Sequence, residues 1–180
     1  MRIIAGSARG TRLTAVPAGT RPLSDRAREG LFASLGDRVM EARCLDLFAG
    51  TGAVGIEALS RGAAWCLFVD RDASAVRAIG ANLERTGLGR QARVVRGDAQ
   101  RTLDREAGRF DLAFLDPPHS HPLASLGRVL RKTVEHLEPG AVLVLTRPRR
   151  DRTDVIPVHW SAVKRLVYGD TLVLLLREEA

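Results

Sequence analysis

The segment Asp116-Pro117-Pro118-His119 combines hydrogen-bond acceptors with a stiffened backbone, directly after an apolar run. Because proline has no N–H, the two prolines leave the Asp116 carboxylate and the Pro117 carbonyl as the local acceptors. An aromatic amine is a poor nucleophile, since its lone pair is delocalised into the ring. Two acceptors that hold its N–H bonds can direct that lone pair at an electrophilic methyl carbon. The segment therefore predicts a catalytic site for methyl transfer to an exocyclic amine; the alternative interpretation is a rigid turn without chemistry.

A glycine-rich stretch, Asp46-Leu-Phe-Ala-Gly-Thr-Gly-Ala-Val-Gly55, joins an apolar strand to a helix. Gly50 and Gly52 allow a tight turn and the close approach of a ligand, and Gly55 allows close packing of the helix on the strand. The spacing is also the dinucleotide-binding fingerprint, and Asp70 is placed to bind ribose hydroxyls in either case. The stretch predicts a nucleotide-type cofactor without deciding between S-adenosylmethionine and NAD.

Three further features favour S-adenosylmethionine. Asp46 lies inside the strand, where a carboxylate is costly unless it meets a cation such as the ammonium group of a methionine. Asp98 follows the third strand and could accept the adenine amino hydrogens, or cap the next helix, or do both. A chain of 180 residues also leaves no room for the second lobe that a dehydrogenase usually needs. The predicted cofactor-binding residues are Asp46, Phe48, Gly50, Thr51, Gly52, Asp70, Arg71, Asp98 and Ala99.

Short apolar strands alternate with helices from Cys44 onward, which is typical of a doubly wound, mostly parallel sheet. The expected strands are Cys44–Phe48, Trp65–Asp70, Ala92–Arg96, Phe110–Asp116 and Ala141–Arg147. The expected helices are Ala53–Arg61, Asp72–Thr86, Gln100–Ala107 and Leu123–Leu137. The chain then ends differently, with strands Ala162–Tyr168 and Thr171–Arg177 separated by the turn signal Gly169-Asp170, which predicts an antiparallel hairpin.

Residues 1–40 differ from the rest and are expected to form a basic extension of the methyltransferase domain 41–180, within one compact unit. Two short strands, at Arg2-Ile-Ile-Ala and Arg12-Leu-Thr, are expected to form a hairpin, and Ser24 or Asp25 to cap a helix that follows. The arginines of this part are either a solvated face or a phosphate-binding platform, and Arg28 with Glu29 could be an ordinary surface pair. The predicted RNA-binding residues are Arg2, Arg9, Arg12, Arg21 and Arg28.

The charge balance favours a polyanionic partner. Lys and Arg number 28 against 21 Asp and Glu, a net charge of +7, and nearly all of the positive charge is guanidinium, which matches phosphate groups bidentately. Cys44 and Cys66 lack Cys or His neighbours at ligand spacing, so buried core cysteines and no metal are expected. No apolar run approaches the roughly 20 residues that span a bilayer, and the first residues do not form a secretory signal, so we expect a cytoplasmic protein.

Asp116-Pro-Pro-His is similar to the (Asp/Asn)-Pro-Pro-(Tyr/Phe) motif of class I amino-methyltransferases. More narrowly, the stretches Arg2–Leu13, Arg21–Phe32 and Leu45–Leu59 resemble the RsmD family, and the resemblance covers nearly the whole chain. It implies a Rossmann-like fold of seven strands with the last one antiparallel, S-adenosylmethionine as cofactor, and methylation of guanine N2 in 16S ribosomal RNA. It also implies cofactor contacts for Asp46, Gly50, Gly52, Asp70 and Asp98, and catalytic contacts for Asp116, Pro117 and Pro118.

The chain departs from the family pattern at His119, where Tyr or Phe normally stacks on the flipped base. A neutral imidazole can still stack, whereas a protonated one would add positive charge beside a sulfonium, so weaker or more pH-dependent activity is expected. His121 offers a second imidazole, and a solvent-facing loop histidine is the alternative for either residue.

Several alternatives stay open at this point. The methyl acceptor could instead be adenine N6 or a DNA base, the protein could be an RNA-binding module with little catalysis, or it could be an NAD-dependent oxidoreductase. The partner is expected to be 16S ribosomal RNA, either naked or within a small ribosomal subunit or assembly intermediate. A monomer is expected.

Overall fold

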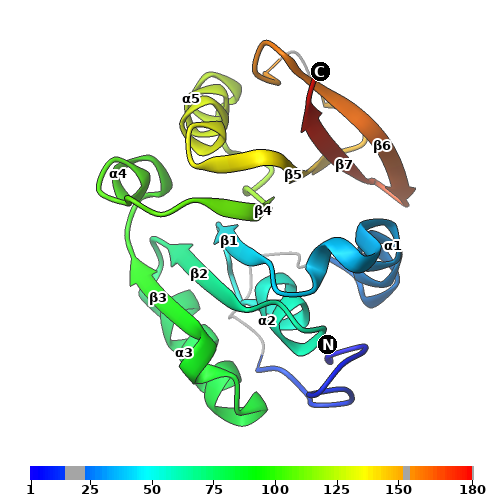
Figure 1. Cartoon of the computed structure of the whole chain (residues 1–180), viewed down its shortest axis with the longest axis vertical. Helices are drawn as coiled ribbons and strands as arrows, with labels where there is room; N and C mark the ends of the chain where they lie inside the picture. Colours follow the sequence, from blue (N-terminus) through cyan, green and yellow to red (C-terminus); the bar gives the residue numbers. More distant parts are fainter. Residues whose placement is uncertain (15–22, 152–154, 180) are drawn as a thin grey trace.

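The computed structural model describes residues 1–14, 23–151 and 155–179, and its centre is a single mixed sheet (Figure 1). The strand order is β3-β2-β1-β4-β5-β7-β6. The first five strands in the chain pair in parallel, and β7 is antiparallel to both β5 and β6. The strands are β1 (Arg43–Leu47), β2 (Trp65–Asp70), β3 (Ala92–Arg96), β4 (Phe110–Leu115), β5 (Leu137–Pro148), β6 (Trp160–Tyr168) and β7 (Thr171–Glu178). The expected seven-stranded α/β fold with a terminal antiparallel hairpin is therefore confirmed.

Helices begin and end at the capping residues that the sequence offers. The Ser24 hydroxyl accepts a hydrogen bond from Ala27 N, and the Asp72 carboxylate accepts one from Ser74 N. Gly87 ends its helix in the left-handed conformation, with φ of 71°, which glycine adopts without strain. The α-helices are α1 (Asp25–Leu35), α2 (Ala53–Ser60), α3 (Ala73–Thr86), α4 (Ala99–Leu103) and α5 (Leu123–Val134). Two short 3₁₀ helices are η1 (Gly36–Val39) and η2 (Gly89–Gln91).

Alternate residues of each central strand enter two separate cores, because successive side chains of a strand point to opposite faces. On one face, Cys44 of β1 and Phe114 of β4 pack against apolar residues of α1, α2 and α3. On the other face, Leu45 and Leu115 of the same two strands pack against α4 and α5. The sheet is thus the middle of three layers. Both cysteines, Cys44 and Cys66, are buried and free, as expected.

The N-terminal residues join the first of these cores, through Ile3, Leu13 and the buried side of α1. The expected pair of short strands is reduced to one antiparallel bridge between Arg2 and Arg12. Backbone bonds from Ile4 N and Ala5 N go instead to the Glu57 carboxylate of α2, at 2.8 and 3.0 Å. Glu57 therefore accepts from these two N–H groups, while Ile3 N and Leu13 N still donate across the turn to the Thr11 and Met1 carbonyls.

Two element boundaries also differ from expectation. The predicted helix over Leu123–Leu137 ends at Val134, and Leu137 already belongs to β5, paired with Phe110 of β4. The helix predicted over Gln100–Ala107 is a single short one that ends at Leu103. In the described part of the chain, no helix has the length and apolarity needed to cross a bilayer.

The sheet order fixes where a ligand can bind. The connections after β1 and after β4 leave toward opposite faces of the sheet, because α2 contributes to the first core and α5 to the second. In doubly wound sheets, ligands bind in the crevice that opens where the strand order reverses, beyond the carboxyl ends of the strands. The glycine-rich stretch follows β1 and Asp116 follows β4, so both lie at this crevice.

Candidate active site

A cavity of about 450 Å³ opens beyond the carboxyl ends of β1, β2 and β4. We call it the glycine-loop cavity. Its volume lies within the range of roughly 300–1,000 Å³ typical of small-ligand sites. It is lined by Leu23, Asp46, Phe48, Ala49, Gly50, Thr51, Ala53, Val54, Asp70, Arg71, Asp72, Asp116, Pro117, Pro118, His119 and Ser120. The structure thus brings together six of the nine predicted cofactor-binding residues and all four predicted catalytic ones.

Asp46 is a buried carboxyl group that lines this cavity. Its Oδ2 accepts a hydrogen bond from Gly55 N at 3.0 Å. Burial raises the pKa of Asp46 well above its usual range; the bond from Gly55 lowers it, and the nearby carboxylates of Asp116 and Asp70 raise it further. Gly55 is required here, because a Cβ at this position would lie 2.4 Å from Phe68 and 2.9 Å from the Asp46 carboxylate. A buried carboxyl group that is costly to ionise on its own is suited to a cationic ligand group, which would stabilise its charged form.

Asp70, at the end of β2, holds the glycine-rich turn in place. Its Oδ2 accepts a hydrogen bond from Gly50 N, and its Oδ1 accepts one from Asp72 N, both at 2.9 Å. Gly50 has φ of 57°, and open space surrounds the position where a Cβ would be. The positive φ of Gly50 and the two hydrogen bonds to Asp70 therefore determine the turn, and the open space beside Gly50 leaves room for a ligand.

Phe48 adopts φ of 59°, a conformation that is uncommon for a bulky residue and is often found at functional sites. Its ring lies at the glycine-loop cavity and meets the His121 ring edge-on, with the centroids 5.1 Å apart. Burial lowers the pKa of His121, and the positive charges of Arg71 and Arg147 lower it further. His121 is thus a packing partner of Phe48, so a purely solvent-facing role for this histidine is wrong.

The other three predicted cofactor-binding residues do not line the glycine-loop cavity. Gly52 is the residue before α2 and has φ of 75°, and its atoms do not line the cavity. Asp98 caps α4 by accepting a hydrogen bond from Arg101 N at 3.1 Å, and Ala99 is the first residue of that helix. The helix-capping interpretation of Asp98 is confirmed, and its contact with an adenine stays a prediction.

Asp116 lies directly after β4 and lines the glycine-loop cavity. One carboxylate oxygen, Oδ1, accepts a hydrogen bond from the Thr146 hydroxyl at the end of β5. Burial raises the pKa of Asp116, while the Thr146 bond and the positive charges of His119 and Arg147 lower it. His119 itself is exposed. Among the residues that the structure describes, no donor bonds to the second oxygen of Asp116, which can therefore accept from a ligand.

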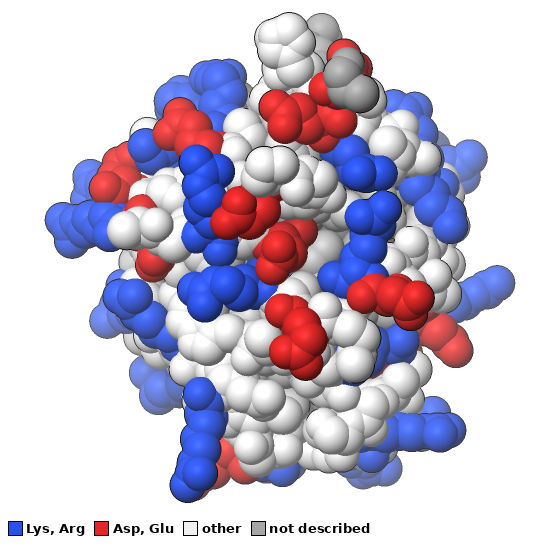
Figure 2. All heavy atoms as spheres, in the orientation of Figure 1, with Lys and Arg blue, Asp and Glu red and all other residues white. Residues whose placement is uncertain are grey.

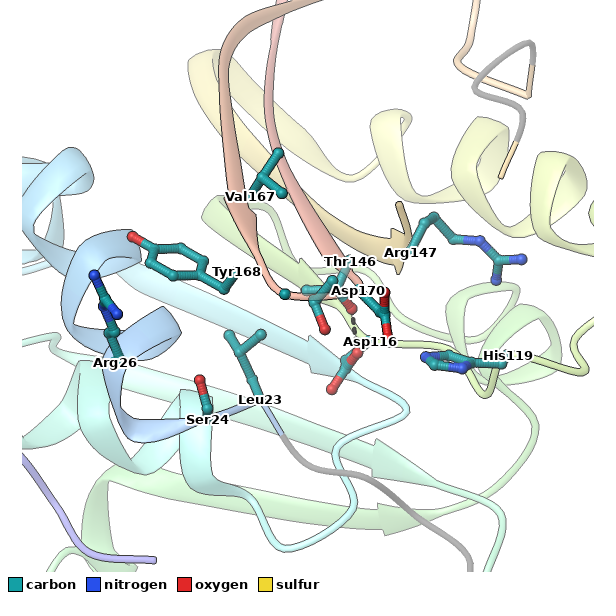
Figure 3. A pocket seen from close by; sticks show the side chains of 12 residues that line it. Leu23, Ser24, Arg26, Asp116, His119, Thr146, Arg147, Val167, Tyr168 and Asp170 are labelled. Atoms are coloured by element: carbon teal, nitrogen blue, oxygen red, sulfur yellow. Dashed lines mark hydrogen bonds between the residues drawn. The ribbon is translucent and has the colours of Figure 1, made fainter. Parts of the chain in front are cut away.

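A second cavity, of about 460 Å³, adjoins the first and shares Leu23, Asp116 and His119 with it. We call it the hairpin cavity, because the β6–β7 turn forms one of its walls (Figure 3). The remaining residues that line it are Ser24, Arg26, Thr146, Arg147, Val167, Tyr168, Gly169, Asp170 and Thr171.

Sequence reasoning missed this second set of residues. Thr146 and Arg147 carried a usable signal, since they are the first polar residues after the apolar run of β5, at the same sheet edge as Asp116. Tyr168 and Asp170 carried none, because their place at the site depends on the hairpin folding back beside β5.

Of the arginines predicted to bind RNA, Arg28 is a correction. Its side chain is fully buried, and Nη2 donates to the Arg2 carbonyl at 2.7 Å and to Asp25 at 2.6 Å, while Nη1 lies 4.0 Å from Glu57. Arg28 therefore ties α1 to the N-terminus and to α2, and is neither a phosphate contact nor a surface partner of Glu29.

The other four arginines predicted to bind RNA are not part of either cavity as far as the structure describes them. Arg2, Arg9 and Arg12 are exposed but line neither cavity, and Arg21 lies outside the described residues. In the face shown in Figure 2, basic side chains surround a central group of acidic ones, so the positive charge is a rim and not a uniform patch. Among the described residues, no three His, Cys, Asp or Glu side chains gather in a way that could hold a metal ion.

Residues 1–177 match a protein family described as conserved hypothetical protein 95. The chain is 40% identical over 182 residues to "Putative rRNA methyltransferase YlbH" of Bacillus subtilis, with 99% of each chain covered. It is 33% identical to "Ribosomal RNA small subunit methyltransferase D" of Escherichia coli, over 100% of this chain and 91% of the relative. The solved structure "Putative methyltransferase yhhF from Escherichia coli" has a TM-score of 0.88 and 34% identity, over 100% of this chain and 98% of that one.

Proposed function

Since the chain belongs to the RsmD family, the group described as conserved hypothetical protein 95, we propose that it transfers a methyl group from S-adenosylmethionine to the exocyclic N2 of a guanine in 16S ribosomal RNA. The observation that carries the proposal is the position of Asp116, which lines both the glycine-loop cavity and the hairpin cavity. A methyl donor in the first and an acceptor amine in the second would meet at this carboxylate.

The residues of the glycine-loop cavity fit S-adenosylmethionine. The buried Asp46 carboxylate suits the methionine ammonium, and Asp70 at the next strand end suits ribose hydroxyls. Phe48 and Pro117 supply apolar surface between these two acidic groups. When bound, the cofactor supplies a methyl carbon on a positively charged sulfur, and that C–S bond breaks as the new N–C bond forms.

The chain's own residues act mainly by positioning. The free oxygen of Asp116 and the Pro117 carbonyl would accept the two N–H bonds of the amine, which holds the nitrogen lone pair toward the methyl carbon. The hydrogen bond from the Thr146 hydroxyl holds the other oxygen of Asp116 in place. The nitrogen proton becomes acidic once the methyl is attached, and it leaves to Asp116 or to water. Asp116 therefore does not need to be a strong base beforehand.

The choice of guanine N2 rests on family membership together with the names of the relatives as ribosomal RNA methyltransferases. Adenine N6 would use the same two acceptors and is the alternative outcome of the experiment below. The partner we propose is 16S ribosomal RNA within a small ribosomal subunit or an assembly intermediate, bound by a monomer in the cytoplasm. The net charge of +7 supports a polyanionic partner.

The test is methyl transfer from radiolabelled S-adenosylmethionine to small ribosomal subunits from cells that lack this gene, with the modified nucleoside identified by mass spectrometry. Wild type is compared with Asp116→Ala and with the control Asp104→Ala, which removes an exposed carboxylate paired with Lys132. We expect N2-methylguanosine from wild type and the control, and none from Asp116→Ala. Label on adenine would overturn the substrate assignment. Absence of label despite cofactor binding would favour an RNA-binding module with little catalysis.

A further inference from the structure

The chain contains a single tyrosine, and the fold places it at the hairpin cavity, beside Asp116. Tyr168 is the last residue of β6, next to the left-handed Gly169 that turns the hairpin. Its hydroxyl end packs onto α1 so closely that a Cβ on Gly30 would lie 1.6 Å from it. Gly30 therefore makes space for this ring, and the ring joins α1 to the hairpin.

The two sides of the hairpin cavity differ in chemistry. Figure 3 shows Asp116 between His119 on one side and Leu23 with Tyr168 on the other. The family motif places an aromatic ring directly after Pro-Pro, and this chain has the smaller His119 there. Leu23 and Tyr168 supply the flat and apolar surface that a base needs, since every base has a π-face that stacks on an aromatic ring.

The rim of the same cavity is basic. Arg26 lies in the first turn of α1, is exposed, and lines the cavity. Arg149 is exposed, and its backbone N–H donates to the Asp170 carbonyl at 2.7 Å, which holds it beside the β6–β7 turn. Arg149 does not itself line the cavity, but its backbone is tied to the β6–β7 turn that does, so an arginine starts from each side of the opening. Guanidinium groups in such positions match the phosphates on either side of a nucleotide whose base is inserted. Neither Arg26 nor Arg149 is among the five arginines that the sequence predicted to bind RNA.

Building on the proposed function, we propose that the hairpin cavity is the acceptor site for one flipped purine nucleotide of an RNA strand. In this site Tyr168 is the stacking wall, and Arg26 and Arg149 bind the flanking phosphates. The strand would then cross the molecule between α1 and the β6–β7 turn. The exocyclic amine of the base would reach Asp116 at the border with the glycine-loop cavity.

The test compares Tyr168→Leu with Tyr168→Phe, which keeps the ring. In methyl transfer to small ribosomal subunits, we expect Tyr168→Leu to raise the KM for RNA about tenfold, the order of effect of losing one base–aromatic stack. Tyr168→Phe should stay within about twofold of wild type. The Kd for S-adenosylmethionine, measured by calorimetry, should be the same for all three proteins. An equal loss of cofactor affinity in Tyr168→Leu, or an unchanged KM, would overturn the proposal.

A second readout does not need catalysis. The riboside 5′-monophosphate of 2-aminopurine, whose fluorescence is quenched by stacking, is titrated into each protein. Quenching by wild type and Tyr168→Phe but not by Tyr168→Leu supports the acceptor site. Equal quenching by all three, or none by wild type, overturns it. Quenching by a wild-type protein that forms no N2-methylguanosine would refute the proposed function and leave the acceptor site standing.

The phosphate contacts are tested with Arg26→Ala against Arg38→Ala, an exposed arginine of η1 that lines neither cavity. We expect Arg26→Ala alone to raise the KM for RNA and to reduce its dependence on salt, because each phosphate contact contributes to that dependence. An equal effect of the two variants would show that Arg26 acts only through the general charge of the surface.

Discussion

The Thr146 hydroxyl donates a hydrogen bond to Oδ1 of Asp116, across the boundary between β5 and the segment that follows β4. The two strands are parallel neighbours whose residues Leu115 and Leu145 are paired, so their next residues emerge side by side. One oxygen of the proposed catalytic carboxylate is thereby fixed by the sheet itself, and the other faces the cavities.

Replacing Thr146 by valine keeps the shape of the side chain and removes the donor. We expect kcat to fall about tenfold, because a hydrogen bond to a charged group contributes roughly 1.5–3 kcal/mol and each 1.36 kcal/mol corresponds to a factor of ten in rate. Thr146→Ser keeps the hydroxyl and should retain most of the activity. The measurement is kcat at saturating RNA and S-adenosylmethionine. A valine variant as fast as wild type would remove Thr146 from the mechanism.

The pH profile should show the environment of Asp116. Burial raises the pKa of this carboxyl group, and Thr146, His119 and Arg147 lower it. The anion accepts the amine N–H, so activity should rise as pH increases through this pKa, which lies above the ordinary value for aspartate. Arg147→Gln removes a positive charge and should move this limb of kcat/KM to higher pH.

The control for this shift is Asp151→Asn, because Asp151 is the ion-pair partner of Arg147. It removes a negative charge near the site, so the limb should not move upward. The pKa of Asp46 is also raised, and the pH dependence of cofactor affinity, measured separately, distinguishes the two carboxylates. A limb that stays in place in Arg147→Gln would contradict the electrostatic argument.

Residues that are close in the sequence could be assigned before the fold was known. The glycine-rich stretch and Asp116-Pro-Pro-His each form one local turn, and the order of strands then brings the two turns to one crevice. Tyr168 could not be found in this way, since it reaches the site only through the pairing of β7 with β5 and of β6 with β7. Thr146 carried a signal as a polar residue after an apolar strand, but its contact with Asp116 depends on the pairing of β5 with β4. Local motifs therefore predicted the proposed cofactor side better than the proposed acceptor side.

Arg28 shows the opposite case, in which a usable pattern was present. It lies on the same helical stripe as Leu31, Phe32 and Leu35, all of which are buried, so its position predicts burial as well. Because arginine is charged, its residue type instead predicted an exposed position. The conflict is resolved by Glu57, a buried carboxylate of α2 that no local pattern connects with α1.

Arg28→Met should therefore act on stability. We expect a loss of about 3 kcal/mol in the free energy of unfolding, because the Arg2 and Ala53 carbonyls lose their buried donor and Glu57 keeps only Arg61 of its two arginine partners. Arg26→Met, two residues away on the exposed side of α1, should change stability by less than about 0.5 kcal/mol. Urea denaturation followed by circular dichroism measures both. Equal stabilities would mean that Arg28 contributes nothing to the fold.

Gly30→Ala tests the acceptor site without altering any residue that lines it. Alanine favours the helix over glycine by about 1 kcal/mol, so α1 itself gains stability. The new Cβ, however, would lie 1.6 Å from the Tyr168 hydroxyl oxygen and 2.8 Å from the ring carbon that carries it, so the ring must move. We expect a raised KM for RNA with unchanged affinity for S-adenosylmethionine.

The matched control is Gly80→Ala in α3, where nothing lies within 4 Å of the new Cβ. It should gain the same helical preference and keep the wild-type KM. Adding Tyr168→Phe to Gly30→Ala removes the closer of the two contacts and should recover part of the lost RNA affinity, because the phenyl ring can return toward its original position. If Gly30→Ala binds and methylates RNA like wild type, the position of the Tyr168 ring does not matter for the substrate, and the stacking wall must be sought elsewhere.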